Sequence, residues 1–107
     1  MGVPAHRLGD ICTGHGCFPP RPNFNASENV FVNRSGWHRM GDRWCGHCCG
    51  LACCSVGPAL EERAATVQGS RTVHVNGRPA VGVGCKISDK AYTATGSGNV
   101  FVGDCPG

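Results

Sequence analysis

The sequence predicts a small all-β domain in which three strand-loop-strand units surround a pseudo-threefold axis. Two observations support this: two short motifs alternate three times along the 107 residues, and turn formers are abundant, with 17 Gly and 7 Pro. One unit of this size could not bury its own apolar face, whereas three units around an axis can. Residues 1–107 suffice for a single domain and are too few for two.

The first motif is a Ser followed, after two residues, by an alternating Val-x-Val run. It occurs at Ser27–Asn33, Ser70–Asn76 and Ser97–Gly103. The runs combine β-branched residues with period-two alternation, and turn formers flank them. Asn76-Gly77 alone predicts a tight turn. We therefore expect three short strands, over Val30–Val32, Val73–Val75 and Val100–Val102.

The second motif is an aliphatic-Gly-acid step, found in His6–Asp10 and His38–Asp42 and, worn, in Val81–Cys85, where Cys replaces the acid. It suits tight bends, because Gly accepts positive φ and Asp bonds nearby backbone. The alternation of the two motifs defines units over about residues 5–35, 37–77 and 80–103. Pro58–Ala65 resembles a short helix, with Pro in the first turn beside two Glu.

The nine cysteines are an odd number, so a complete set of intramolecular disulfides is impossible. Residues 1–10 lack the apolar core of a signal peptide, and no stretch approaches the roughly 20 apolar residues of a membrane span. We expect synthesis in the cytoplasm with mostly reduced thiols, which serve as metal ligands or small buried groups. A metal would staple a domain with so little core.

The net charge of +3 is modest. The N-terminal half is basic through five arginines, Arg7, Arg21, Arg34, Arg39 and Arg43, which we interpret as ordinary solvated surface. A nucleic-acid interface would show a denser basic stripe with interleaved aromatic residues. We therefore expect no nucleic-acid partner and no small-molecule substrate.

Three stretches resemble the phage-type members of the PAAR-repeat family, the spike tips of contractile phage tails and type VI secretion needles. They are Leu8–Arg21, Asn29–Asn33 and His38–Asp42. Pro4-Ala5-His6-Arg7 stands in the place of the Pro-Ala-Ala-Arg that names the family. The resemblance runs from Pro4 to Gly103.

The resemblance implies a conical fold with a metal near its apex and a base that caps a trimeric β-helical spike protein, one tip per trimer. It implies one zinc ion, with iron as the alternative, transient contact with a target outer membrane during puncture, and no enzymatic activity. The phage-type opening favours a bare tip at the baseplate of a virion or phage-like particle. The alternative is a type VI secretion needle, delivered extracellularly.

The family binds its metal through three His and one Cys, and two of these positions match here. His15 lies in the Gly-His-Gly loop, and His47 opens a His-x-Cys segment that ends at Cys49. The other two family positions fall on Glu62 and Asp89. The predicted ligand set is His15, His47, Cys49 and Cys85. The open alternatives for the third and fourth ligands are Cys45, Cys48, Cys53, Cys54, Glu62 and Asp89.

Residues of the three Val-x-Val strands are predicted to bind the spike: Val30, Phe31, Val32, Val73, Val75, Val100, Phe101 and Val102. Among the remaining His and Cys, we expect Cys12 and Cys17 to be buried thiols and His38 to be a packing residue. His74 is expected to face solvent or a partner, and His6 to lie at the surface.

Two other functions were weighed against the spike tip. A cysteine-rich zinc module that binds protein or nucleic acid would use the Cys45–Cys54 cluster, but Cys85 and Cys105 offer no second paired chelate. A small Cys-His enzyme would use Cys49 and His47, but no orienting acid is evident beside them. The sequence therefore favours a tip protein that is not an enzyme.

Overall fold

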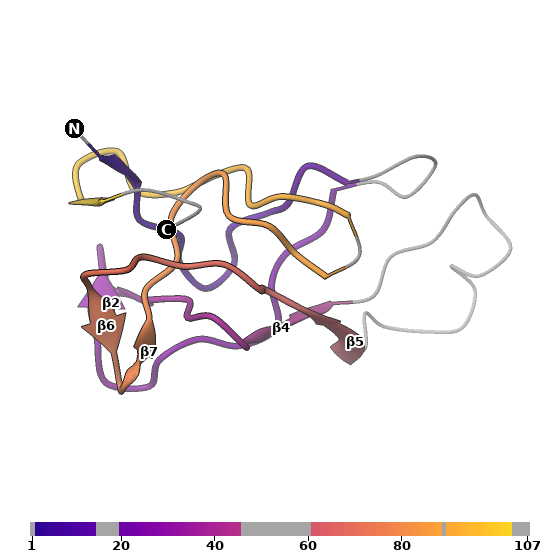
Figure 1. Cartoon of the computed structure of the whole chain (residues 1–107), viewed down its shortest axis with the longest axis horizontal. Helices are drawn as coiled ribbons and strands as arrows, with labels where there is room; N and C mark the ends of the chain where they lie inside the picture. Colours follow the sequence, from indigo (N-terminus) through magenta and orange to yellow (C-terminus); the bar gives the residue numbers. More distant parts are fainter. Residues whose placement is uncertain (1, 15–19, 46–60, 89, 104–107) are drawn as a thin grey trace, which may run out of the picture.

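The structure is a computed structural model that describes residues 2–14, 20–45, 61–88 and 90–103. These residues form short antiparallel strands, isolated β-bridges and turns, which confirms the predicted small all-β fold (Figure 1). The strands are β1 Val3–Pro4, β2 Phe31–Val32, β3 Ser35–Gly36, β4 Arg43–Cys45, β5 Glu61–Ala65, β6 His74–Val75, β7 Arg78–Pro79 and β8 Phe101–Val102.

The predicted helix over Pro58–Ala65 is wrong for its described part, because Glu61–Ala65 is strand β5. It pairs antiparallel with β4, with Arg43 opposite Ala65 and Cys45 opposite Glu61. The local helix signal is worth only tenths of a kcal/mol per residue. Pairing with β4 satisfies the backbone and places Ala64 in a buried cluster with Trp44, so the tertiary contact decides.

The three predicted strands are present, and each belongs to a hairpin. In β2–β3 and β6–β7 the two-residue turns Asn33-Arg34 and Asn76-Gly77 have positive φ throughout, as tight hairpins of this kind require. The third strand pair has no turn, because β8 pairs with β1 from the other end of the chain, with Val3 opposite Val102. The three equivalent strand pairs are called hairpins below. The N-terminal strand therefore completes the last unit.

The pseudo-threefold arrangement is visible in a closed ring of backbone hydrogen bonds. The N–H of His6 donates to the carbonyl of Val81 (2.9 Å), that of Val81 to His38 (3.1 Å), and that of His38 back to His6 (3.0 Å). These residues hold the same position in the three copies of the second motif. Every bond of the ring joins two different units.

The residues that recur in the copies of both motifs have the same structural role in each unit. The hydroxyls of Ser27, Ser70 and Ser97 each accept the N–H of the Val three residues later, at 2.9, 3.0 and 2.9 Å. The glycines of the aliphatic-Gly step, Gly9, Gly41 and Gly84, have φ of +91°, +93° and +96°. A side chain would be strained at such angles.

The third unit departs from the others where the chain ends meet. Arg7 pairs with Asp10 and Arg39 with Asp42, both at 2.9 Å, whereas Gly82 and Cys85 occupy these positions in the third unit. A Cβ on Gly82 would lie 2.5 Å from Val3 Cγ2 and 2.7 Å from Val102 Cγ1. The ion pair is thus replaced by close packing against β1 and β8.

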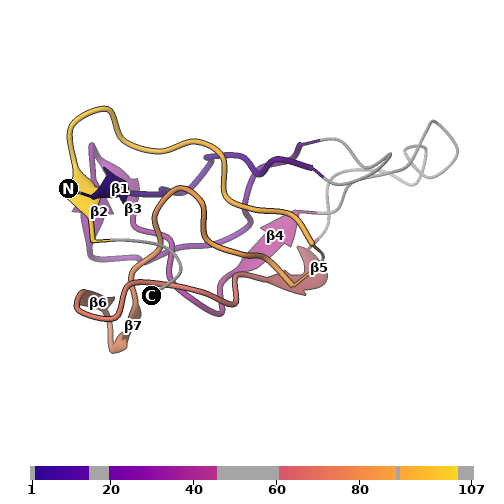
Figure 2. The ribbon, with the colours of Figure 1, turned by 45° about the horizontal axis from the view of Figure 1, so that its top comes forward.

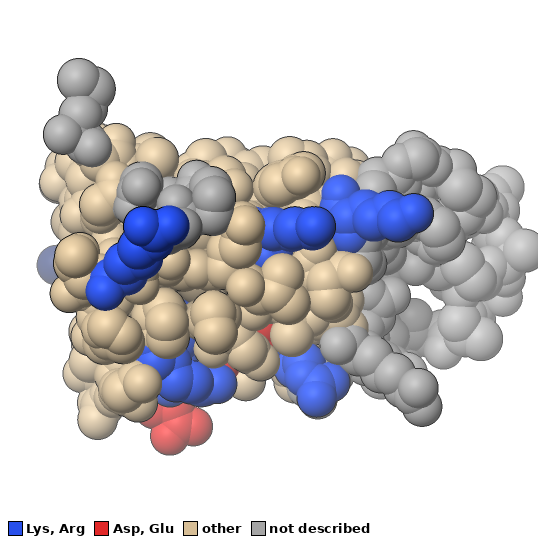
Figure 3. Space-filling view, in the orientation of Figure 1, with Lys and Arg blue, Asp and Glu red and all other residues tan. Residues whose placement is uncertain are grey.

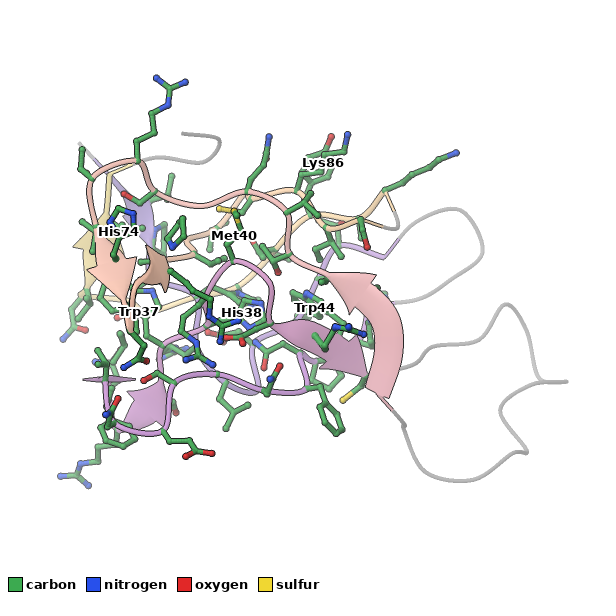
Figure 4. The ribbon with its side chains drawn as sticks, turned by 60° about the horizontal axis from the view of Figure 1, so that its bottom comes forward. Trp37, His38, Met40, Trp44, His74 and Lys86 are labelled. Atoms are coloured by element: carbon green, nitrogen blue, oxygen red, sulfur yellow. The ribbon has the colours of Figure 1, made fainter. Side chains whose placement is uncertain are left out.

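Two apolar clusters lie along the molecule. One contains Cys12, Trp44, Ala64, Ile87 and Ala91. The other contains Val75, Ala80 and Val102, with Val3, Val30, Trp37 and Val73 packed against it. His6 and His38 lie in the interior with Trp44, with ring centroids 5.1 to 5.3 Å apart. Figure 4 shows His38 and Trp44. The predicted packing role of His38 is confirmed.

The expectation that His6 lies at the surface is wrong, because the residue is fully buried. Its Nδ1 lies 2.8 Å from the Thr95 carbonyl, which can only accept, so Nδ1 carries the proton. Nε2 then accepts from the Asn23 amide at 3.0 Å. Both ring nitrogens are hydrogen-bonded in the neutral form, so the ring is buried without an unsatisfied polar atom.

His38 has the equivalent environment in the second unit. Its Nδ1–H donates to the Asn25 carbonyl (3.0 Å), and its Nε2 accepts the Thr66 hydroxyl (2.7 Å). Trp44 Nε1–H donates to the same hydroxyl (2.9 Å). Burial lowers the pKa of His6 from 6.5 to about 4 and lowers the pKa of His38 well below its ordinary value.

Acid is expected to destabilise the domain. Between pH 6.5 and 4 the unfolded chain binds protons at His6 and His38 that the folded protein excludes, so stability is full above this range and falls through it. His6 alone should remove about 2 kcal/mol between pH 7 and pH 5. Urea unfolding at several pH values measures this. A free energy of unfolding that is flat from pH 7 to 5 would contradict it, and exposed His74→Gln should keep the wild-type profile.

Replacing Gly82 by Ala should destabilise the domain by about 1–3 kcal/mol, because the added Cβ overpacks the β1–β8 closure. Gly98→Ala is the matched control, since a Cβ there meets nothing within 4 Å. Thermal unfolding of both variants measures the difference. Equal melting temperatures would show that the closure tolerates the methyl group.

Candidate functional site

The part of the molecule that the structure describes has two different ends (Figures 1 and 2). The strands of the three hairpins gather at one end, called here the hairpin end. Strands β4 and β5 lie toward the other, which we call the β4–β5 end. The predicted spike-binding residues belong to the first end. The described residues next to the segments of the predicted ligands His15, His47 and Cys49 lie at the second.

At the hairpin end, alternation along each strand separates the predicted spike-binding residues into two sets. Phe31 and Phe101 are 59% and 56% exposed, and His74 is exposed at the equivalent position of the second unit. Val32, Val75 and Val102 point into the core, since successive strand residues face opposite sides. Val30, Val73 and Val100 are half-buried. The outward orientation expected of His74 is confirmed.

Amide side chains tie neighbouring units together at this end. The Asn33 amide donates to Asn99 Oδ1, and the Asn76 amide donates to Asn29 Oδ1, both at 2.9 Å. Arg7 and Arg39 donate to the same two turn asparagines, Asn33 and Asn76, at 3.2 and 3.1 Å. The exposed Phe and His side chains therefore project from hairpins that are joined to one another.

At the β4–β5 end, the chain positions that flank residues 15–19 and 46–60 lie side by side. The N–H of Cys45 donates to the Pro22 carbonyl (3.1 Å), and the N–H of Cys12 to the Arg21 carbonyl (3.0 Å). Asn23 and Trp44 form a bridge, and Cys45 pairs with Glu61. The segments that carry His15 and His47 thus leave the domain from adjacent points.

The predicted ligands His15, His47 and Cys49 lie outside the described residues. So do the alternatives Cys48, Cys53, Cys54 and Asp89, as well as Cys17 and the side chain of Glu62. Within the part of the chain that the structure describes, no group of three or more His, Cys, Asp or Glu could hold a metal. The neighbouring departure points and the His and Cys donors of the two segments nevertheless fit a zinc site.

Cys85 is the predicted ligand that the structure describes. It is fully buried and disulfide-bonded, and its N–H donates to the Thr93 hydroxyl at 3.0 Å. A disulfide sulfur is not the thiolate that binds zinc, so Cys85 could serve as a ligand only when reduced. Neither Cys12 nor Cys45 is disulfide-bonded, and the predicted burial of Cys12 is confirmed.

Arg21 is the residue that the sequence analysis missed. It was counted with the solvated arginines, yet it is only 3% exposed. Its side chain contacts Cys12 and Cys45 and stacks on Trp44. Its position between Pro20 and Pro22 gives no signal of this role, because Cys12, Trp44 and Cys45 belong to other parts of the sequence.

Of the other four arginines interpreted as solvated surface, one is exposed, Arg34, and three are half-buried, Arg7, Arg39 and Arg43. Figure 3 shows separate Lys and Arg side chains spread over one face, with acidic side chains few among them. Arg78 reaches the buried Asp42 at 3.0 Å, whereas Arg71 and Lys86 are exposed. In the described ranges, no helix is long and apolar enough to cross a membrane.

No family model matches the chain. Two curated toxins share a 77-residue stretch with it at 36% identity: the NAD(P)(+) glycohydrolase toxin Tse6 and the (p)ppApp synthetase toxin Tas1, from two strains of Pseudomonas aeruginosa. The stretch covers 72% of this chain and 17% of each toxin. The chain is therefore similar to a small part of much longer proteins.

These relatives correct one expectation. The sequence favours a protein that is not an enzyme, yet both relatives are toxins named for enzymatic activities. Neither the resemblance to tip proteins nor the lack of an orienting acid beside Cys49 and His47 says anything about the longer proteins that contain a similar segment. The proteins to which this chain is related include enzymes.

Proposed function

We propose that this domain is the tip of a trimeric β-helical spike in a contractile injection machine of the type VI secretion kind. The observation that carries the proposal is the closed threefold hydrogen-bond pattern, which gives one monomer three near-equivalent hairpins at one end. Such a base matches a trimer, whose three chains end in equivalent strand edges that need covering. The similarity to two toxins favours a secretion needle over a phage particle as the machine.

The hairpin end has the chemistry of a docking surface. Phe31 and Phe101 expose more than half of their area at equivalent positions, with His74 at the third. Burying aromatic side chains against a partner is favourable at about 25 cal/mol per Å². Their joined hairpins lower the entropy cost of presenting them. One tip would therefore cap one trimer.

At the β4–β5 end we propose a single structural zinc ion, with iron as the alternative. His15 and His47 would hold it, and Cys49 and reduced Cys85 would complete the tetrahedral set. Bound there, the metal would supply no more than rigid cross-linking of segments that leave the domain at adjacent points. This end would face the target envelope, and the loaded tip, made in the cytoplasm, would leave the cell with the needle.

One metal ion per chain is expected in protein purified under reducing conditions. His15→Ala and His47→Ala should each lower the metal content and the melting temperature together, because a structural zinc site contributes folding energy. Elemental analysis with thermal unfolding tests this. His74→Gln, at the opposite end, should keep full occupancy. Full occupancy in the double His15→Ala, His47→Ala variant would refute the ligand assignment.

Phe31→Glu and Phe101→Glu should each weaken docking to a trimeric spike by at least about tenfold while the tip stays folded, because both side chains are exposed. Native mass spectrometry should find one tip per three spike chains.

Phe24→Glu is the matched control, since Phe24 is 45% exposed and its backbone bonds Arg43 of β4 rather than a hairpin strand. It should dock normally. A three-to-three complex, or equal loss in the Phe24 variant, would overturn the capping model.

A further inference from the structure

Arg21 lies directly after the segment that carries His15, and its buried side chain reaches toward the segment that carries His47. We propose that Arg21 is a positioning residue that fixes, through one guanidinium group, the relative placement of the two chain segments from which the candidate ligands extend. Its importance for metal binding rests on the proposed zinc site. The clamp itself stands on contacts between described residues.

Two hydrogen bonds from the guanidinium reach two different segments. Nε–H donates to the carbonyl of Cys45 at 2.8 Å, at the last residue of β4 before residues 46–60. Nη1–H donates to Cys12 Sγ at 3.0 Å, three residues before His15. Arg21 itself follows residues 15–19. Arg21 thus joins three points of the chain: its own position after residues 15–19, Cys12 before those residues, and Cys45 before residues 46–60.

A third contact fixes the plane of the guanidinium. Its carbon lies 5.0 Å from the centroid of the Trp44 ring, and that ring belongs to the buried cluster next to His6 and His38. Arginine, unlike lysine, combines stacking on an aromatic face with N–H donors in a fixed planar arrangement. Arg21 therefore fixes the positions of both segments relative to the buried cluster that contains Trp44.

Burial makes these contacts obligatory. Arg21 is only 3% exposed, so its guanidinium must satisfy its donors within the protein and cannot exchange these partners for solvent. The Cys12 sulfur also accepts the Gly14 N–H at 3.3 Å, which extends the fixed geometry to the residue before His15.

The fold does not depend on Arg21 alone, which makes the proposal testable. The same segments are also joined by backbone contacts, through the Asn23–Trp44 bridge and the bond from Cys45 N–H to Pro22. Arg21→Gln removes the charge and the fork but keeps a donor, and Arg21→Lys keeps the charge without the fork. Exposed Arg71→Gln is the matched control.

The first experiment measures zinc affinity by chelator competition and the Co²⁺ spectrum of each variant. Arg21→Gln should bind zinc about 10–100-fold more weakly, as is typical when the groups that orient ligands are removed. Arg21→Lys should fall between this variant and the wild type, and Arg71→Gln should match the wild type. Wild-type affinity and an unchanged Co²⁺ spectrum in Arg21→Gln would overturn the proposal.

The second experiment needs no metal and no variant that folds. In the wild-type protein, the Arg21 Nε–H signal should exchange slowly with water, and Cys12 should resist alkylation, mapped by peptide mass spectrometry. Fast exchange of the Arg21 Nε–H proton with water would contradict the proposed clamp. If the wild type binds no zinc while Arg21 is protected, the zinc site fails and the clamp stands. If zinc binds equally well without Arg21, the clamp fails and the zinc site stands.

Discussion

The three backbone hydrogen bonds among residues 6, 38 and 81 each cross from one unit to the next, so no unit completes its own pairing. With little apolar volume available, the domain places polar groups on its axis and satisfies them there. His6 and His38 each use both ring nitrogens, and Trp44 joins the same network through Thr66. A buried polar network that is fully satisfied specifies one arrangement, which explains how so small a core defines both ends of the molecule.

Much of the fold was predictable because its repeats are local. The Ser and Gly positions of the two motifs identified the strands and bends, since a hydroxyl cap and a positive φ depend on neighbouring residues. Long-range effects were not predictable. The pairing of β5 with β4 overrode a weak helix signal, and β1 supplied a strand for a unit 100 residues away. His6 was misplaced because its burial depends on Asn23 and Thr95.

The two candidate sites likewise differ in how far the sequence alone predicts them. All eight residues of the three strands are predicted to bind the spike, but Val32, Val75 and Val102 are buried in the core. Period-two alternation holds the information that separates them from the exposed Phe31 and Phe101. At the β4–β5 end, the ligand types follow from motif resemblance. The clamp by Arg21 does not, because a buried arginine between two prolines looks like any surface arginine until Trp44 is placed beside it. The toxin relatives show that such a segment occurs within enzymes.

The pairing of β1 with β8 also fixes how many units the domain can contain. In an open solenoid each unit contacts only its neighbours, so copies can be gained or lost by duplication without disturbing the remainder. Here β1 supplies the second strand of the last unit by pairing with β8. A fourth unit would separate Val3 from Val102 and break this pairing. The units can therefore differ in sequence, as Cys85 in the place of Asp10 and Asp42 illustrates, whereas their number is fixed. The closed ring of hydrogen bonds therefore accepts sequence differences between its units but no additional unit.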